Sequence, residues 1–378
     1  MKSVSFISGD YPVTNSPFIY NLSNYFNNNN VKVFIPHINT PLYTKLKSSK
    51  LKSILSKYKF LVLIYRVLLY DLKFINRVLS YSSKIKVTDE ENVFAIEKFG
   101  LFLSFLNGIK PRLYVSLETN YIFHSETLTE FFLNIFEKIY LIFYRPPVMC
   151  TSSSRLNILT YNNKIKLKNT LIVPVCGTQL KITEKNAYIR SKYNIDEKKI
   201  IVLIAGTMGH SLVDEIVSNI NMWPSEFVLF LHSSNGVYTD FILDASLNSK
   251  SIILSDELFT IEDAESKIYN SADISIIMYP DNSINYKLTA FSSGKLAAST
   301  KCGLPVLVPD FKEYRDLILD YKFGLTTNIF NIPTNLQLLN NSYSFFSSES
   351  KKAYQNIYNF ENYKESIDNF LVNLSTSR

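Results

Sequence analysis

The sequence predicts an α/β protein in which two parallel sheets are each covered by helices. At 378 residues the chain is longer than one ordinary compact domain, which suggests two domains. A content of 46% hydrophobic and 19% charged residues is typical of a folded globular protein. Short apolar runs bounded by turn residues alternate with segments of helical length, which is the pattern of doubly wound sheets.

The apolar runs predict the strands of each half. In the first half they are Val4–Ser8, Val31–Ile35, Lys84–Thr88, Leu113–Leu117, Val148–Thr151 and Leu171–Val175. In the second half they are Ile200–Ala205, Phe227–His232, Ile252–Leu254, Ile274–Tyr279 and Val306–Val308. A polar stretch near residues 176–198 predicts the linker, and apolar residues at helical spacing in 347–374 predict one or two terminal helices. We therefore expect domains at residues 1–176 and 177–345 and a tail at 346–378.

The cysteines and the apolar runs exclude several classes of protein. The three cysteines show no CxxC spacing and no clustered histidines, so neither a disulfide framework nor a metal site is predicted. The longest apolar run, Phe60–Tyr70, has 11 residues and contains Arg66, whereas about 20 apolar residues are needed to cross a bilayer. Met1–Gly9 lacks the features of a signal peptide and predicts a buried strand. We expect a cytoplasmic protein.

Positive charge is concentrated near the N-terminus. The net charge is +7, and the stretch Tyr11–Tyr70 contains no Asp or Glu but eight basic residues, namely Lys32, Lys45, Lys47, Lys50, Lys52, Lys57, Lys59 and Arg66. Apolar residues alternate with the lysines in residues 41–70, as in a basic amphipathic segment on an anionic membrane surface. A solvated helix face explains the same pattern equally well. No nucleic-acid-binding motif accompanies the charge.

The stretch Ser292-Ser293-Gly294-Lys295 lies between two of the predicted strands, so a helix must cross over between them. Ser292 and Ser293 are good N-cap residues, Gly294 permits close backbone approach, and Lys295 falls in the first turn. Gly303 predicts the end of this helix. Free backbone N–H groups and a lysine at a helix N-terminus make an anion site. The alternative is a capped helix whose lysine points to solvent.

A second glycine-bearing turn follows the strand Ile200–Ala205. The residues of the turn that we expect at the site are Gly206, Thr207, Gly209 and His210, and a helix is predicted to begin near Leu212. His210 is a candidate ligand-facing donor, with a capping or exposed role as the alternative. After the next strand, His232 is expected in another strand-end loop. The glycine spacing is not that of a dinucleotide-binding fingerprint or a P-loop.

The order of these elements, with "SADISIIMY", "SSGKLAASTKCGLPVLVPD" and "YKFGL", resembles the donor-binding half of a GT-B glycosyltransferase. More closely, residues 200–345 are similar to the family-4-like (group 1) transferases of bacterial polysaccharide clusters. The resemblance is weaker in the first half, at "YVSLE" and "CTSSSRLNIL".

The resemblance implies two Rossmann-like domains facing a central cleft, with the terminal helices packing back on the first domain. It implies a nucleotide-sugar donor, with UDP or GDP as the expected nucleotide, held by the second domain, and a lipid-linked or oligosaccharide acceptor held by the first. No further cofactor is implied. The expected process is capsule or O-antigen biosynthesis at the inner face of the plasma membrane.

The sequence departs from this family at two charged positions. The usual Glu-x7-Glu pair falls on Ala290 and Ala298, so both carboxylates are missing. Lys295 is then the best candidate for neutralising the donor phosphates, with Lys287 second. Because no Asp-x-Asp triplet occurs, we expect metal-independent transfer.

The candidates for a catalytic base in the first domain are Asp10, Glu118 and His124, with Glu118 slightly favoured. Two other functions stay open. One is a nucleotide-sugar 2-epimerase of the same fold, and the other is a catalytically silent assembly partner, which the two alanines make credible.

Overall fold

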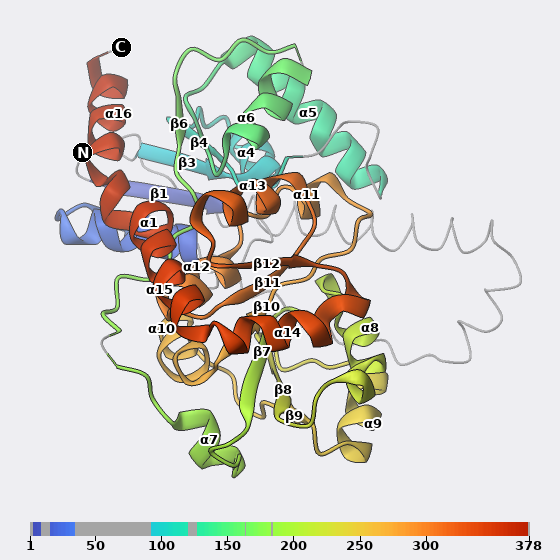
Figure 1. Ribbon diagram of the computed structural model, residues 1–378. Helices are drawn as coiled ribbons and strands as arrows, with labels where there is room; N and C mark the ends of the chain where they lie inside the picture. Colours follow the sequence, from blue (N-terminus) through green and yellow to red (C-terminus); the bar gives the residue numbers. More distant parts are fainter. Residues whose placement is uncertain are drawn as a thin grey trace, which may run out of the picture. The chain divides into compact units, whose positions relative to one another are not determined.

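The structure is a computed structural model that describes residues 3–8, 16–34, 92–119, 127–162, 164–182 and 184–376. The chain divides into two compact units (Figure 1). Unit 1 comprises Met1–Val13, Leu22–Val173 and Phe370–Arg378, and unit 2 comprises Thr14–Asn21 and Pro174–Asn369. Each unit contains one six-stranded parallel sheet, which confirms the predicted fold class.

The sheet of unit 1 has the order β2-β1-β3-β4-β5-β6. Its strands are β1 (Ser3–Ser8), β2 (Lys32–Phe34), β3 (Asn92–Ile96), β4 (Leu113–Ser116), β5 (Val148–Cys150) and β6 (Thr170–Ile172). Five of these coincide with predicted strands to within a few residues. The predicted strand Lys84–Thr88 lies outside the described residues, and β3 was not predicted.

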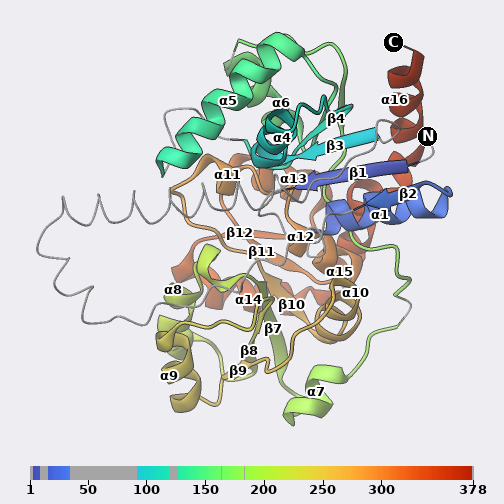
Figure 2. The same cartoon turned by 180° about the vertical axis from the view of Figure 1, so that it is seen from behind.

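The helices of unit 1 lie on both faces of its sheet, as in a doubly wound fold (Figures 1 and 2). On one side lies α1 (Pro17–Asn28), whose residues from Leu22 onward belong to unit 1, and on the other lie α4 (Glu97–Leu106), α5 (Leu128–Tyr144) and α6 (Ser153–Asn157). The rings of Phe6, Phe26 and Phe94 pack together where α1 covers the sheet. On the other side α4 approaches β1 so closely that a Cβ on Gly100 would lie 2.1 Å from the carbonyl oxygen of Ile7. A glycine is therefore required there.

The sheet of unit 2 has the order β12-β11-β10-β7-β8-β9. Its strands are β7 (Ile200–Gly206), β8 (Phe227–Ser233), β9 (Ile252–Leu254), β10 (Ile274–Ile276), β11 (Val306–Pro309) and β12 (Gly324–Thr327). Five were predicted, and β12 was not. Side chains alternate between two cores, since Val202 and Ile204 belong to one buried cluster and Ile201 and Leu203 to another.

Helices cover both faces of this second sheet. One face packs against α8 (Val213–Ser218), α9 (Asp240–Asn248) and α14 (Ile332–Asn341). The other packs against α7 (Tyr188–Tyr193), α12 (Gly294–Lys301) and α13 (Lys312–Tyr321). The shorter helices are α10 (Ile261–Asp263) and α11 (Ile284–Lys287). The predicted terminal helices are present as the end of α15 (Tyr343–Ala353) and as α16 (Lys364–Thr376), which is shared between the two units.

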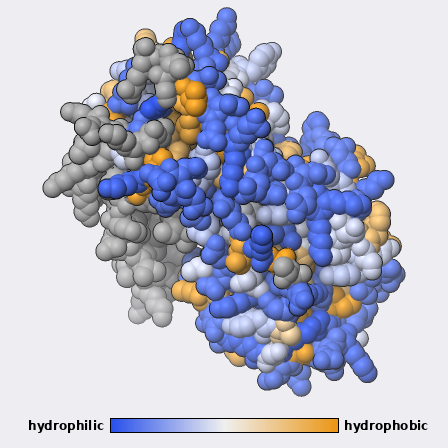
Figure 3. All heavy atoms as spheres, turned by 90° about the vertical axis from the view of Figure 1, so that its left-hand side faces the viewer, coloured by the Kyte–Doolittle hydropathy of each residue, from blue (hydrophilic) through white to orange (hydrophobic). Residues whose placement is uncertain are grey.

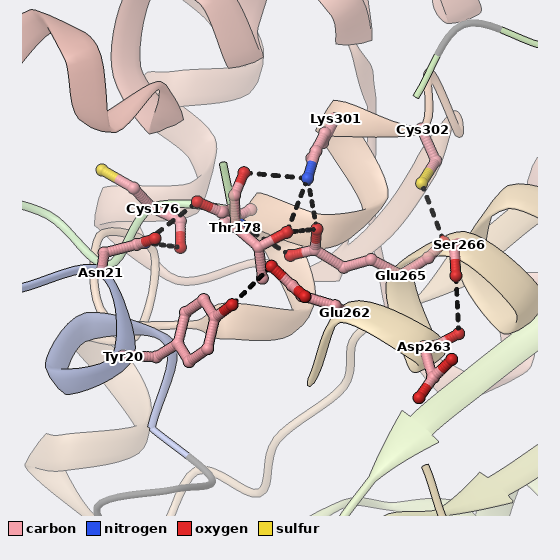
Figure 4. A network of polar contacts seen from close by, with 12 residues as sticks. Tyr20, Asn21, Cys176, Thr178, Glu262, Asp263, Glu265, Ser266, Lys301 and Cys302 are labelled. Carbon is pink, nitrogen blue, oxygen red and sulfur yellow. Dashed lines mark hydrogen bonds and ion pairs between the residues drawn. The ribbon is translucent and has the colours of Figure 1, made fainter. Parts of the chain in front are cut away.

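A buried ion pair fixes the chain where it enters unit 2 (Figure 4). The Lys301 ammonium pairs with Glu265 and donates hydrogen bonds of 2.9 Å to the carbonyl and hydroxyl oxygens of Thr178. The side chains of Lys301 and Glu265 are only 4% and 2% exposed. Nearby, the Asn21 amide donates to the carbonyl oxygens of Cys176 and Gly177 at 3.2 and 3.0 Å. Glu265 also accepts hydrogen bonds from the Thr178 backbone N–H and hydroxyl, at 2.9 and 2.5 Å, so the segment 176–178 is held by three separate parts of unit 2.

The described surface contains both hydrophilic and apolar residues, as is usual for a globular protein. On the face shown in Figure 3, hydrophilic residues predominate and apolar residues are scattered between them. Cys150, Cys176 and Cys302 are all free thiols. Among the described helices, none has the length and apolar character needed to cross a membrane.

Candidate functional site

The carboxyl ends of neighbouring parallel strands bring two predicted site segments together in unit 2. Gly206 ends β7 with a φ of +106°, a conformation that side-chain-bearing residues rarely adopt. The side chain of Lys295 lies against it, so that a Cβ on Gly206 would be 2.5 Å from Lys295 Cε. A residue with a side chain could not occupy position 206 without displacing Lys295.

The predicted crossover helix is confirmed as α12. Ser293 is its N-cap, and the Ser293 hydroxyl accepts a 3.4 Å hydrogen bond from the backbone N–H of Leu296. Gly294 and Lys295 form the start of the first turn, and Gly303, with a φ of +70°, follows the last turn. The flanking strands β10 and β11 pair in parallel, as the crossover requires. The helix N-terminus therefore lies at the same edge of the sheet as Gly206.

Lys295 is a half-buried cation without a carboxylate partner among the described residues. Its ammonium donates a 3.0 Å hydrogen bond to the Ser211 hydroxyl and lies 5.1 Å from the ring centroid of Tyr279. Burial lowers the pKa of Lys295 to about 8. A partly desolvated ammonium beside a helix N-terminus favours binding of an anion, which would restore its charged state.

The other predicted residues of the glycine-bearing turn follow Gly206 at the carboxyl end of β7. Gly209 and His210 lie in a short 3₁₀ helix, Met208–His210, and α8 begins at Val213, as predicted from the helix start near Leu212. Thr207 is exposed, with its hydroxyl 3.4 Å from that of Ser234. The side chain of His210 lies outside what the structure describes.

Two other predicted residues have local partners. Ser292 donates a 3.2 Å hydrogen bond to the carbonyl oxygen of Leu288. Lys287 forms an ion pair with Asp281, and its side chain is 44% exposed, so its charge is already partly neutralised. Of the two candidate lysines, Lys295 is the one without a counterion within the described ranges.

His232 does not lie in a loop, as predicted, but within β8. Its side chain is buried and its Nδ1 lies 3.0 Å from the Ser255 hydroxyl. Burial lowers the pKa of His232 to about 4, so the imidazole is neutral at physiological pH. The strand extends one residue beyond His232, to Ser233, so the imidazole lies within the sheet and not in the loop that follows it.

Ala290 and Ala298 are buried in two apolar clusters of unit 2. The carbonyl oxygen of Ala290 accepts a 2.8 Å hydrogen bond from the buried hydroxyl of Tyr358. An ionised carboxylate at either buried position would need a partner to offset the cost of its desolvation. The packing of this chain therefore matches the absence of the Glu-x7-Glu pair.

The carboxyl edge of the sheet in unit 1 presents an acidic residue that the sequence analysis missed. Glu97 follows β3 directly, and its Oε1 accepts hydrogen bonds from the backbone N–H groups of Leu117 and Glu118 at the end of β4. The side chain of Glu118 is exposed. Asp10 and His124 lie outside the described residues. The apolar run "NVFAI" before the glutamate indicates a strand end, but it does not indicate the backbone partners of the carboxylate.

Several solved structures share the architecture of both units. Sucrose-phosphate synthase from Thermosynechococcus elongatus matches with a TM-score of 0.68 at 13% identity over 100% of both chains. WaaG, a glycosyltransferase involved in lipopolysaccharide biosynthesis, matches with a TM-score of 0.58 at 13% identity over 93% of this chain and 94% of its own. HepE from Anabaena in complex with UDP-glucose matches with a TM-score of 0.60 at 9% identity over 99% and 100%.

The chain has the GT-B fold. No family model and no curated protein sequence matches it. The GT-B fold is thus evident from the structure, whereas only about one residue in ten is identical between this chain and these solved structures.

Proposed function

We propose that this protein is a glycosyltransferase that moves a sugar from a nucleotide-sugar donor to a lipid-linked or oligosaccharide acceptor. The observation that carries the proposal is Lys295, a half-buried ammonium without a described counterion, at the N-terminus of α12 and against Gly206. The GT-B fold supports it, since WaaG is a glycosyltransferase and HepE has been solved with UDP and with UDP-glucose.

In this proposal unit 2 binds the donor through its diphosphate. Transfer breaks the bond between sugar C1 and a phosphate oxygen, so negative charge develops on the departing nucleoside diphosphate. Lys295 and the backbone N–H groups at the start of α12 stabilise that charge without needing a bound metal. Because Gly206 has no side chain, Lys295 can lie against the end of β7. Thr207 and Gly209 belong to the turn that follows. UDP and GDP are the expected nucleotides.

The acceptor would be held by unit 1, at the inner face of the plasma membrane in bacterial polysaccharide biosynthesis. The basic segment at residues 41–70 lies outside the described residues. Support comes from α5, on which large apolar side chains are exposed at helical spacing, namely Leu128, Phe132, Ile139 and Phe143. These residues would contact the membrane surface from which a lipid-linked acceptor is taken.

A catalytically silent assembly partner is the second candidate, favoured by the buried Ala290 and Ala298. A thermal-shift screen with UDP, GDP, CMP and dTDP, followed by release of the nucleotide from the matching nucleotide sugar, separates the two. A transferase shows a nucleotide-dependent rise in melting temperature and slow release, because water replaces the missing acceptor. A silent partner that has lost its donor site shows neither.

A further inference from the structure

A pocket lies within unit 2 at the end of α12 that is remote from Lys295. Its volume of about 510 Å³ is within the usual range for small-molecule sites. Two stretches of chain, residues 178–182 and 351–361, contribute its walls, together with Lys301 in the last turn of α12. Lys295 is in the first turn of the same helix, about 9 Å away along the helix axis. The pocket is therefore separate from the candidate donor site.

The negative charges at this pocket are already neutralised. The Lys301 ammonium pairs with Glu265 and donates its other hydrogen bonds to Thr178, as Figure 4 shows. Glu361, a carboxylate that lines the pocket, pairs with Lys364 at a distance of 2.7 Å. Because each of these carboxylates has its own lysine, their repulsion of an incoming anion is weak.

Two lysines of the pocket, in contrast, have no carboxylate partner among the described residues. One is Lys351, whose stem lies against Gly303, so that a Cβ on Gly303 would be 2.6 Å from Lys351 Cε. The next residue, Lys352, does have a partner, since it pairs with Glu349 at 2.6 Å. The other lysine is Lys181, whose side chain is exposed. The pocket therefore carries an excess of positive charge.

Two neutral hydrogen-bond donors belong to the same pocket. The side-chain nitrogen of Gln179 is buried and has no hydrogen-bond partner in the described part of the chain, which is rare in folded proteins. This amide can rotate toward the pocket without giving up a hydrogen bond of its nitrogen. Burial raises the pKa of Tyr354, so its hydroxyl keeps its proton and can donate. Both groups suit a ligand that presents several acceptor oxygens.

We propose that this pocket binds a small molecule that carries a phosphate group, with the phosphate paired to Lys351 and Lys181. Lysine is a common phosphate ligand, because its ammonium is a compact positive charge with three donors. The two neutral donors complete the set of hydrogen bonds to the phosphate oxygens. The pocket is larger than one phosphate ion, so the ligand has an organic part, and Leu180 and Ile182 provide apolar contacts for it.

The ligand would join the segments through which the chain enters and leaves the main part of unit 2. This part runs from Pro174 to Asn369, and the two walls of the pocket lie close to its beginning and its end. The segments already touch, since the Gly177 N–H donates a 3.1 Å hydrogen bond to the carbonyl oxygen of Tyr358. A bound molecule adds contacts between them, so binding should raise the melting temperature.

The test uses the full-length protein, with glycerol 3-phosphate as the probe and glycerol as its uncharged match. Glycerol 3-phosphate should raise the melting temperature, whereas glycerol with sodium chloride at the same ionic strength should not. Calorimetry should show roughly tenfold or weaker binding in Lys351→Met and about threefold or weaker binding in Lys181→Met. Lys352→Met is the matched control and should bind within about twofold of the wild type, because its ammonium pairs with Glu349.

Lys295→Met distinguishes this pocket from the donor site. It should bind glycerol 3-phosphate as the wild type does while losing affinity for UDP or GDP. Loss of glycerol 3-phosphate binding in Lys295→Met, with normal binding in Lys351→Met, would place the phosphate in the donor site and overturn the inference.

The inference is also overturned if the wild type does not bind the probe at about 20 mM, a concentration at which even millimolar affinity is detected. Binding of glycerol 3-phosphate without any binding of UDP or GDP supports the pocket and contradicts the proposed function. If Lys351→Met does not fold, Lys181→Met decides the question, because its side chain is exposed. Wild-type affinity in that variant would then refute the inference.

Discussion

Lys295 and Gly206 fit together as a side chain and the backbone surface that it covers. A Cβ on Gly206 would be 2.5 Å from Lys295 Cε and 3.3 Å from its Nζ. The glycine ends β7 and the lysine begins α12, 89 positions later in the chain, and the distance between them depends on β7 and β10 being neighbours in the sheet. The candidate donor site is therefore a product of sheet order as well as of local sequence.

Gly206→Ala should damage both stability and nucleotide binding. The added Cβ adopts an unfavourable positive φ and displaces Lys295, so we expect a loss of about 1–3 kcal/mol in the free energy of unfolding and at least roughly tenfold weaker nucleotide binding. Gly209→Ala is the control for stability, because nothing lies within 4 Å of a Cβ there. Urea denaturation and calorimetry measure the two effects. Equal stability of the two variants would contradict the described packing.

Nucleotide binding should weaken as the pH rises above about 8. Burial lowers the pKa of free Lys295 to about 8, and a bound diphosphate raises it again. Below pH 8 the lysine is already charged, whereas above pH 8 it must take up a proton on binding. Calorimetry at pH 8.5 in two buffers of different ionisation enthalpy should therefore detect proton uptake. Lys295→Met should show none, and uptake that persists in this variant would assign the effect to another group.

The buried pair of Lys301 and Glu265 should be a major contributor to the stability of unit 2. Lys301→Met leaves a carboxylate that is 2% exposed without its cation, so we expect a loss of about 3–5 kcal/mol in the free energy of unfolding. Lys312→Met removes a pair whose side chains are 85% and 54% exposed and should cost less than about 1 kcal/mol. Adding Glu265→Leu to Lys301→Met should recover part of the loss. No difference between the two lysine variants in urea denaturation would refute the prediction.

Two parts of the chain are candidates for membrane binding, namely the basic segment at residues 41–70 and helix α5. Reversing Lys45, Lys47, Lys50 and Lys52 to Glu should abolish salt-sensitive co-sedimentation with anionic vesicles, since each lysine contributes about 1 kcal/mol near such a surface. Phe132→Ser with Phe143→Ser on α5 should weaken the binding that remains at high salt. Unchanged sedimentation of the lysine variant would favour the reading of that segment as a solvated helix face.

The parts of the fold that local signals determine could be predicted from the sequence. The caps of α12 and the apolar runs of β10 and β11 all fall within residues 274–309, so local signals located the helix and its first-turn lysine. The strand β12 was missed because "GLTT" contains too few apolar residues to form a recognisable run.

Glu97 could not have been found in the same way. Its significance lies in a positive φ and in two N–H groups twenty and twenty-one positions away, which only the pairing of β3 with β4 brings close. Glu118, the favoured candidate for the base, lies beside it and donates its backbone N–H to Glu97, and its catalytic role stays a prediction. For His232, the sequence indicated the end of a strand, but it could not distinguish the last strand residues from the loop that follows them.

The most direct test of the account is the nucleotide affinity of Lys295→Met. The methionine keeps the apolar stem and removes the charge, so the fold should survive while a charged hydrogen bond to the diphosphate, about 1.5–3 kcal/mol, is lost. Calorimetry with UDP and GDP should show roughly ten- to a hundredfold weaker binding than the wild type, and Lys287→Met should bind normally. Wild-type affinity in a folded Lys295→Met protein would contradict the central claim.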